Sequence, residues 1–217
     1  MTTEPDYLRT TRASYDAIAS EYAEVFRDEL AGKPLDRAMF AAFAELVLTG
    51  GGGRVLDVGS GPGHATAHLH GLGLDVSGVD LSPEMVAQAR RAYPGLRFEE
   101  GSMLALDAPD ASLAGLVANY SIIHIPAELL PEVFGEFRRV LAPGGRALVV
   151  FQVGDETTHR TEAFGREISL DAGRLRPDHV ERLLGEAGLP VEARLLREPR
   201  QGMEPTPQAC LLARRPA

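Results

Sequence analysis

The sequence predicts an α/β fold in which a mostly parallel β-sheet carries helices on both faces. Short apolar runs alternate with helical patterns from residue 54 onward, which is typical of strand, helix, strand units. The last two apolar runs, residues 189–196 and 208–213, follow each other with no helical pattern between them, so they favour an antiparallel edge hairpin. Together with five earlier runs they predict a seven-stranded mixed sheet.

Two amphipathic helices are expected ahead of the sheet. Apolar residues recur at helical spacing in both of them, namely Tyr15, Ile18, Tyr22 and Phe26 in the first and Leu35, Met39, Phe43 and Leu46 in the second. The Gly-Lys-Pro sequence at residues 32–34 separates the two. We expect residues 1–50 to form an N-terminal helical cap that belongs to the same domain as the core, residues 51–217.

The other elements follow in order along the chain. The five earlier strand candidates cover residues 54–58, 74–79, 96–100, 113–119 and 146–152. Four helices are expected: one begins near His64, one begins at Ser82, a natural N-cap followed by Pro83, and the others cover residues 130–141 and 177–187. Residues 154–174 are polar and show no regular pattern, so we expect a loop over the mouth of the sheet.

Composition restricts the partners of the protein. Acidic residues number 31 against 22 basic ones, and no run of Lys or Arg offers a surface for a phosphate backbone, so we expect no nucleic acid partner. The single cysteine, Cys210, gives no disulfide framework and fits a cytoplasmic location. The N-terminus lacks a signal peptide's apolar core and no apolar stretch approaches a membrane span, so we expect no membrane partner.

Residues 55–63, Val-Leu-Asp-Val-Gly-Ser-Gly-Pro-Gly, predict a nucleoside-binding loop. An apolar strand delivers Asp57 and then runs into Gly59, Gly61 and Gly63, which let the backbone turn tightly and approach a ligand that a Cβ would exclude. Asp80 ends the next apolar run, where a carboxylate can accept hydrogen bonds from vicinal ribose hydroxyls. We therefore expect two carboxylates to bracket one ligand.

Other ligand-binding motifs do not fit the same stretch. A dinucleotide fingerprint requires glycine at the sixth position of GxGxxG, and that position is His64 counted from Gly59 and Thr66 counted from Gly61. No Gly-Lys-Ser/Thr sequence follows, which excludes an ATP-type phosphate loop. His64 and His68 are four residues apart on a helix, but no carboxylate between them or third ligand completes a metal site, so we expect no metal.

Four segments, in this order and spacing, resemble the class I S-adenosylmethionine-dependent methyltransferases. They are residues 57–63 at the glycine loop, 79–85 around Asp80, 119–126 after the fourth strand and 139–145 before the fifth. The opening segment, residues 15–22, also resembles the cap helix of the small-molecule branch, related to quinone-biosynthesis methyltransferases. The resemblance covers nearly the whole chain and implies a Rossmann-like sheet with the ligand at the carboxyl ends of the strands.

The resemblance also implies the cofactor S-adenosylmethionine, with S-adenosylhomocysteine as product, and its contacts. The predicted cofactor-binding residues are Tyr15, Tyr22, Asp57, Gly59, Ser60, Gly61, Gly63, Asp80, Leu81, Met85, Ser102, Met103, Asn119, Tyr120 and Ser121. Family members usually carry an acidic residue after the third strand to meet the adenine amino group, whereas this chain has Gly101, Ser102 and Met103 there. We expect Ser102 or backbone groups around Met103 to hold the ring instead.

The implied reaction is a direct displacement in which oxygen, nitrogen or carbon of a small-molecule acceptor attacks the sulfonium methyl. The alternative is a protein of this fold that binds the cofactor or its product without methyl transfer. Two catalytic candidates are His124, which follows the fourth strand and is either a general base or a structural hydrogen-bond donor, and His159, which lies in the expected loop and is either an acceptor-pocket residue or solvated. We expect a monomer or a homodimer.

Overall fold

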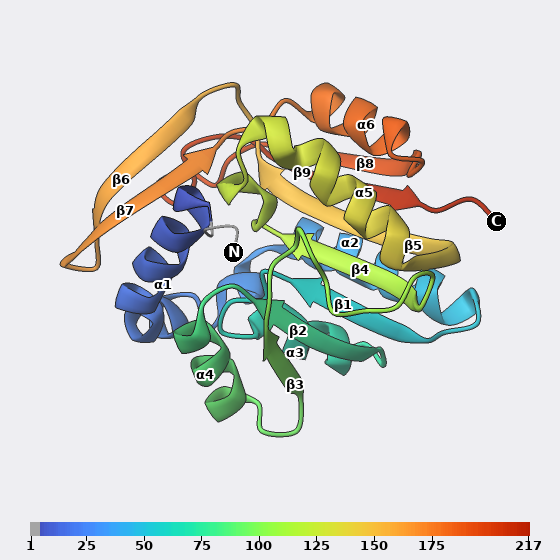
Figure 1. Cartoon of the computed structure of the whole chain (residues 1–217), viewed down its shortest axis with the longest axis horizontal. Helices are drawn as coiled ribbons and strands as arrows, with labels where there is room; N and C mark the ends of the chain where they lie inside the picture. Colours follow the sequence, from blue (N-terminus) through green and yellow to red (C-terminus); the bar gives the residue numbers. More distant parts are fainter. Residues whose placement is uncertain (1–4) are drawn as a thin grey trace.

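A seven-stranded sheet occupies the centre of the molecule (Figure 1). The computed structural model of the protein describes residues 5–217. The strand order is β3-β2-β1-β4-β5-β9-β8, in which the first five strands are parallel and the last two are antiparallel to their neighbours. The predicted mixed sheet with an antiparallel edge pair is therefore confirmed.

The strands lie close to their predicted positions. Their bounds are β1 Arg54–Val58, β2 Asp75–Asp80, β3 Arg97–Glu100, β4 Leu113–Asn119, β5 Leu141–Gln152, β8 Val191–Arg197 and β9 Gln208–Arg214. The chain order reverses between β1 and β4, since β2 and β3 lie on one side of this pair and β5 on the other. Such a switch point leaves a crevice at the carboxyl ends of the two strands, which is where ligands of open α/β sheets bind.

Helices cover both faces of the sheet. They are α2 Pro34–Thr49 and α3 His64–Gly71 on one face, α5 Leu130–Val140 and α6 Pro177–Glu186 on the other, and α4 Pro83–Ala92 beside β2 and β3. Successive residues of a strand face opposite ways, so Leu116 of β4 packs in the cluster with Phe134 and Phe137 of α5, and Val117 packs with Phe40 and Phe43 of α2. No helix within residues 5–217 is long and apolar enough to cross a bilayer.

Residues 154–174 are not the irregular loop that their sequence suggested. They contain a β-hairpin, β6 Thr157–Ala163 paired with β7 Arg166–Gly173, which forms a second, two-stranded sheet beside α1 Asp6–Val25 (Figure 1). The prediction was wrong because the hairpin is mostly polar: Ile168 and Leu170 are its buried large apolar residues, and they pack against Ile18 of α1 in one small apolar cluster. The hairpin and α1 thus form one small apolar cluster that neither element forms alone.

The cover over the strand ends consists of α1 and this hairpin, while α2 lies against a face of the sheet. Phe40, Phe43 and Val47 of α2 are buried among strand residues, so this helix has the role of a face helix rather than a cap. Ser14 of α1 fixes the cover, because its hydroxyl donates to the carbonyl of Ser169 at 2.8 Å and accepts from the N–H of the same residue at 3.1 Å.

A buried ion-pair network ties α2 to the C-terminal strands. The guanidinium of Arg197, at the end of β8, donates to the Asp36 carboxylate of α2 at 2.6 and 3.1 Å and to the Glu204 carboxylate at 2.5 and 2.7 Å. The three side chains are only 8%, 2% and 12% exposed. Lys33, itself buried, lies 3.5 Å from Glu204 and places its ammonium over the Tyr120 ring.

We expect Arg197→Met to destabilise the protein by about 3–5 kcal/mol, because it leaves the buried Asp36 carboxylate without its cation and Glu204 with Lys33 alone, while it keeps the side-chain volume. Arg194→Met is the matched control, since Arg194 lies on the same strand but forms exposed pairs with Asp178 and Glu181, so we expect little change. Urea unfolding of both variants measures the difference. Equal losses would show that the buried network is dispensable.

Candidate cofactor and acceptor site

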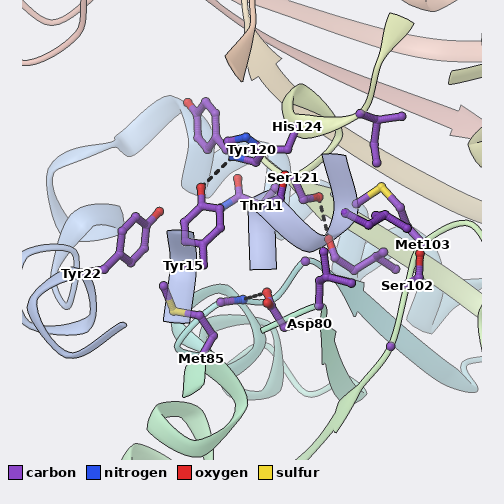
Figure 2. Close-up of a pocket in the computed structure, with 18 residues that line it drawn as sticks. Thr11, Tyr15, Tyr22, Asp80, Met85, Ser102, Met103, Tyr120, Ser121 and His124 are labelled. Atoms are coloured by element: carbon purple, nitrogen blue, oxygen red, sulfur yellow. Dashed lines mark hydrogen bonds between the residues drawn. The ribbon is translucent and has the colours of Figure 1, made fainter. Parts of the chain in front are cut away.

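A cavity of about 720 Å³, including its open mouth, lies at the carboxyl ends of β1, β2 and β4 beneath α1 (Figure 2). It contains most of the cofactor contacts predicted from sequence. The predicted residues that line it are Tyr15, Tyr22, Gly59, Gly61, Asp80, Leu81, Met85, Ser102, Met103, Asn119, Tyr120 and Ser121. The catalytic candidate His124 lines it too. The fold therefore gathers residues from both ends of a 110-residue stretch into one hollow.

Asp80 holds the glycine loop in place. One oxygen of its carboxylate accepts the Gly61 N–H at 2.7 Å (Figure 2), and the other accepts the Ser82 N–H at 2.9 Å. Burial raises the pKa of Asp80 to about 6, although these N–H donors act to lower it. Each oxygen has a second lone pair, so the carboxylate retains acceptor capacity toward the cavity.

Two glycines of the loop are required for different reasons. A Cβ on Gly59 would lie 2.3 Å from Cβ of Ser121, so this glycine lets the ends of β1 and β4 approach each other. Gly61 has a φ of +53° and an added Cβ would meet no atom within 4 Å, although the residue lines the cavity. The space beside Gly61 is thus open in the protein and available to a ligand.

Three of the predicted cofactor contacts lie outside the cavity. Asp57 is fully buried, and its carboxylate accepts the Thr66 hydroxyl at 2.6 Å on the α3 side of the loop. Ser60 is also buried and is directed at Gly78 of β2, and Gly63 is packed under the Phe98 ring. The expectation that two carboxylates bracket the ligand is therefore corrected: Asp80 alone faces the cavity, and Asp57 supports the loop from behind.

Burial raises the pKa of Asp57 to about 7, the Thr66 hydrogen bond acts to lower it, and the nearby charge of Asp80 adds to the rise. One oxygen of this carboxylate has no hydrogen-bond partner within the described residues. Two buried carboxylates therefore share the base of the glycine loop. A cationic ligand beside them would favour the ionised form of both carboxylates and so oppose the rise in their pKa values.

Tyr15 and His124 form a hydrogen-bonded pair at the roof of the cavity. The Tyr15 hydroxyl lies 2.7 Å from Nε2 of His124 (Figure 2), and Nδ1 of His124 lies 2.7 Å from the backbone carbonyl of Asp171. A carbonyl only accepts, so Nδ1 carries the proton, and Nε2 of the neutral ring accepts the Tyr15 hydroxyl. Burial lowers the pKa of His124, which favours this neutral form, and raises the pKa of Tyr15.

His159 does not reach the cavity. Successive side chains of a strand alternate between its faces, and in β6 it is Thr158 and Arg160 that face the site, while His159 points outward and pairs with Asp171 at 2.7 Å. The segment expected over the mouth of the sheet therefore faces the site through Thr158 and Arg160 and not through His159. Arg160 was not among the predicted site residues.

Thr158 and Arg160 line a second, larger hollow, which we call the acceptor chamber, of about 1270 Å³ including its open mouth. The acceptor chamber shares Tyr15, Tyr22, Asn119, Tyr120 and His124 with the first cavity, so the two spaces adjoin. The Tyr15–His124 pair stands at their boundary.

The cavity also contains residues that sequence reasoning did not select. They are Leu8, Thr11, Val58, Gly101 and Ile125. Helical spacing could have identified the first two, because residues 8, 11, 15 and 22 fall on one face of α1. The Tyr120 backbone, at φ +55°, is a strained position for a tyrosine, and it sets the ring between the two spaces.

Comparison with known proteins identifies the class. Residues 55–145 match the family described as methyltransferase domain. Demethylmenaquinone methyltransferase of Chlorobaculum parvum is 38% identical over 98 residues, which are 45% of this chain and 40% of that protein. The malonyl-[acyl-carrier protein] O-methyltransferase of Halorhodospira halophila is 35% identical over 167 residues, 74% of this chain and 53% of that protein. The chain thus spans about half the length of the curated relatives it matches.

Solved structures resemble the whole chain. DhpI, in a complex with SAH, is 25% identical with a TM-score of 0.74 and covers 99% of both chains. The magnesium protoporphyrin IX methyltransferase of Synechocystis, with bound SAM, is 16% identical with a TM-score of 0.72 and covers 99% of this chain and 100% of the other. Residues 55–145 are therefore a methyltransferase domain, and the chain has the fold of class I S-adenosylmethionine-dependent methyltransferases, which confirms the resemblance found in the sequence.

The buried carboxylates predict an unusual pH dependence for the ligand-free protein. A carboxylate whose pKa is raised in the folded state contributes stability below its unfolded pKa, near 4, and loses it as pH rises through the folded pKa, here about 7 for Asp57. We expect the free energy of unfolding of the wild type to fall between pH 5 and pH 8 relative to that of Asp57→Asn, by at least about 1.4 kcal/mol, the equivalent of one pKa unit.

Urea unfolding at several pH values measures this difference. Asp171→Asn provides the control for charge removal at an exposed position, and we expect its curve to follow the wild type. A constant gap between wild type and Asp57→Asn across the range would mean that Asp57 ionises normally.

Proposed function

We propose that the protein is an enzyme that transfers the methyl group of S-adenosylmethionine to a small-molecule acceptor. The observation that carries the proposal is that one cavity joins the glycine loop and Asp80 to the Tyr15–His124 pair, and that this cavity adjoins a second chamber large enough for an acceptor. The methyltransferase domain and the neighbours with SAH and SAM support the same assignment.

The residues of the first cavity fit the cofactor. Asp80 offers a carboxylate to the ribose hydroxyls, and the open space beside Gly61 admits the part of the cofactor that passes closest to the backbone. Met85, Ser102 and Met103 would enclose the adenine ring, although the Ser102 hydroxyl already accepts the Leu104 N–H at 3.3 Å. Tyr22, from α1, would close the methionine end.

Positioning is the main contribution of the protein to the reaction. The bound cofactor supplies an electrophilic methyl group, and the acceptor chamber would hold the attacking atom in line with it, so that a bimolecular encounter becomes a near-attack arrangement. For an acceptor that must lose a proton, Tyr15 and His124 offer a route: the acceptor proton passes to the pair as Nε2 takes the Tyr15 proton. His159 has no part in this proposal.

We infer a single structural unit in which α1 covers the core, a small-molecule partner, no nucleic acid or membrane partner, and a cytoplasmic monomer or homodimer. A protein that binds the cofactor without transferring its methyl group would show binding and no turnover, and radiolabel transfer from S-adenosylmethionine into a panel of small acceptors distinguishes the two.

Cofactor binding is tested most cleanly at Gly61. Gly61→Ala and Gly144→Ala place a Cβ at two positions of positive φ with no atom within 4 Å, and only Gly61 lines the cavity. We expect both variants to lose about 1–2 kcal/mol of stability from backbone strain, and only Gly61→Ala to lose S-adenosylhomocysteine affinity, by tenfold or more. Calorimetry measures binding, and equal affinities in the two variants would place the cofactor elsewhere.

The proton route is tested by Tyr15→Phe and His124→Asn. With a hydroxyl or amine acceptor we expect each variant to lower kcat about 10²- to 10⁴-fold while S-adenosylhomocysteine affinity stays within a few fold, because the pair acts on the acceptor. The kcat of the wild type should fall at low pH as the pair becomes protonated, and a parallel loss of kcat and cofactor affinity would indicate a structural role instead.

A further inference from the structure

One charged side chain in the acceptor chamber lacks a partner. Lys33 pairs with Glu29 and with Glu204, and Arg174 pairs with Glu156. Arg160 has no hydrogen bond or ion pair with any residue of the described range 5–217, although it lines the chamber together with these groups.

The hairpin fixes the direction of this arginine. Arg160 is paired across the strands with Leu170, and Thr158 with Ala172, and all four side chains line the chamber. Leu170 is buried against α1, so the face that carries Arg160 is the inward face of the hairpin. Its position therefore follows from the strand register and not from a flexible loop.

The Arg160 charge also acts on the residues at the boundary of the two spaces. Burial lowers the pKa of His124, and Arg160 lowers it further. Burial raises the pKa of Tyr15 and of Tyr22, and Arg160 acts in the opposite direction on both. The guanidinium is thus close to the place where the methyl group would be transferred.

We propose that Arg160 binds an oxyanion of the acceptor, so that the substrate class is a small acid carrying a carboxylate or a phosphate-type group. This inference rests on the proposed function and names the substrate class of the same site. A guanidinium recognises both kinds of group by parallel N–H donors in a planar fork. The Thr158 hydroxyl, which donates to the Ala172 carbonyl at 3.2 Å, lies on the same face and lines the chamber beside it.

An acidic acceptor also fits the cations of the chamber. Lys33 and Arg174 already pair with carboxylates, so Arg160 is the cation with which an incoming anion can pair while the Tyr15–His124 pair stays neutral. The acid then serves as the anchor that orients the rest of the molecule toward the methyl group.

The test is a binding titration at constant ionic strength on protein saturated with S-adenosylhomocysteine. The probes are glutarate, methyl phosphate and the neutral glutaramide. We expect at least one anion to bind the wild type and glutaramide to bind at least tenfold more weakly, and we expect Arg160→Gln to reduce the anion affinity about tenfold or more. Arg176→Gln, at an exposed arginine outside the chamber, is the matched control and should bind as the wild type does.

The outcomes separate this inference from the proposed function. Preference for glutarate identifies a carboxylate and preference for methyl phosphate identifies a phosphate-type group. Equal anion binding by Arg160→Gln and the wild type, or no anion binding to the wild type, overturns the inference even when S-adenosylhomocysteine binds. If S-adenosylhomocysteine fails to bind, the proposed function fails, and the same titration on the unloaded protein still decides whether Arg160 holds an anion.

Discussion

The site depends on the hydrogen bonds that Asp80 accepts from the backbone of Gly61 and Ser82. They join the glycine loop after β1 to the start of α4 after β2, so the two strand ends form one rigid rim. Asp16 of α1 extends this rim, because its carboxylate accepts the Ser82 hydroxyl at 2.5 Å. The Ser82 hydroxyl in turn accepts the Met85 N–H at 3.1 Å and caps α4. A single chain of hydrogen bonds thus connects loop, helix and cover.

This arrangement places two carboxylates where they are largely shielded from water. Burial is the main reason why the pKa values of Asp57 and Asp80 lie above the ordinary range; the charge of Asp80 adds to the rise at Asp57, and the charge of Asp16 adds to the rise at Asp80. S-adenosylmethionine carries a sulfonium and an amino group, so its binding would supply the missing positive charge. The empty site is therefore the less stable form at neutral pH, and ligand binding and loop stability are coupled.

The strands of the sheet could be predicted from the sequence because the patterns that indicate strands and helix ends are local in the chain. The bounds of β1 and β4 agree with the predicted ones, and Ser82 caps α4 as expected, since apolar runs and helix caps each act within a few residues. The hairpin was not predicted because its strands have few apolar residues. Ile168 and Leu170 are buried only through packing against Ile18 of α1, which lies far from them in the sequence. The prediction that Asp57 faces the ligand was wrong for a similar reason. Asp57 is next to Val58 on β1, so its side chain faces the opposite side of the strand, where its carboxylate accepts a hydrogen bond from the Thr66 hydroxyl of α3.

In the proposed reaction, the cover would connect recognition of the acceptor to the chemistry. α1 contributes Tyr15 to the boundary between the two spaces, and the hairpin contributes both Arg160 and the Asp171 carbonyl that fixes the tautomer of His124. The two elements are held together by the Ser14 hydrogen bonds, the ion pair between Glu21 and Arg166 and a small apolar cluster. These contacts fix α1 against the hairpin, so they also fix Tyr15 against His124 and place Arg160 on the same side of the chamber. Recognition of an acceptor and removal of its proton would therefore depend on the same packing between α1 and the hairpin.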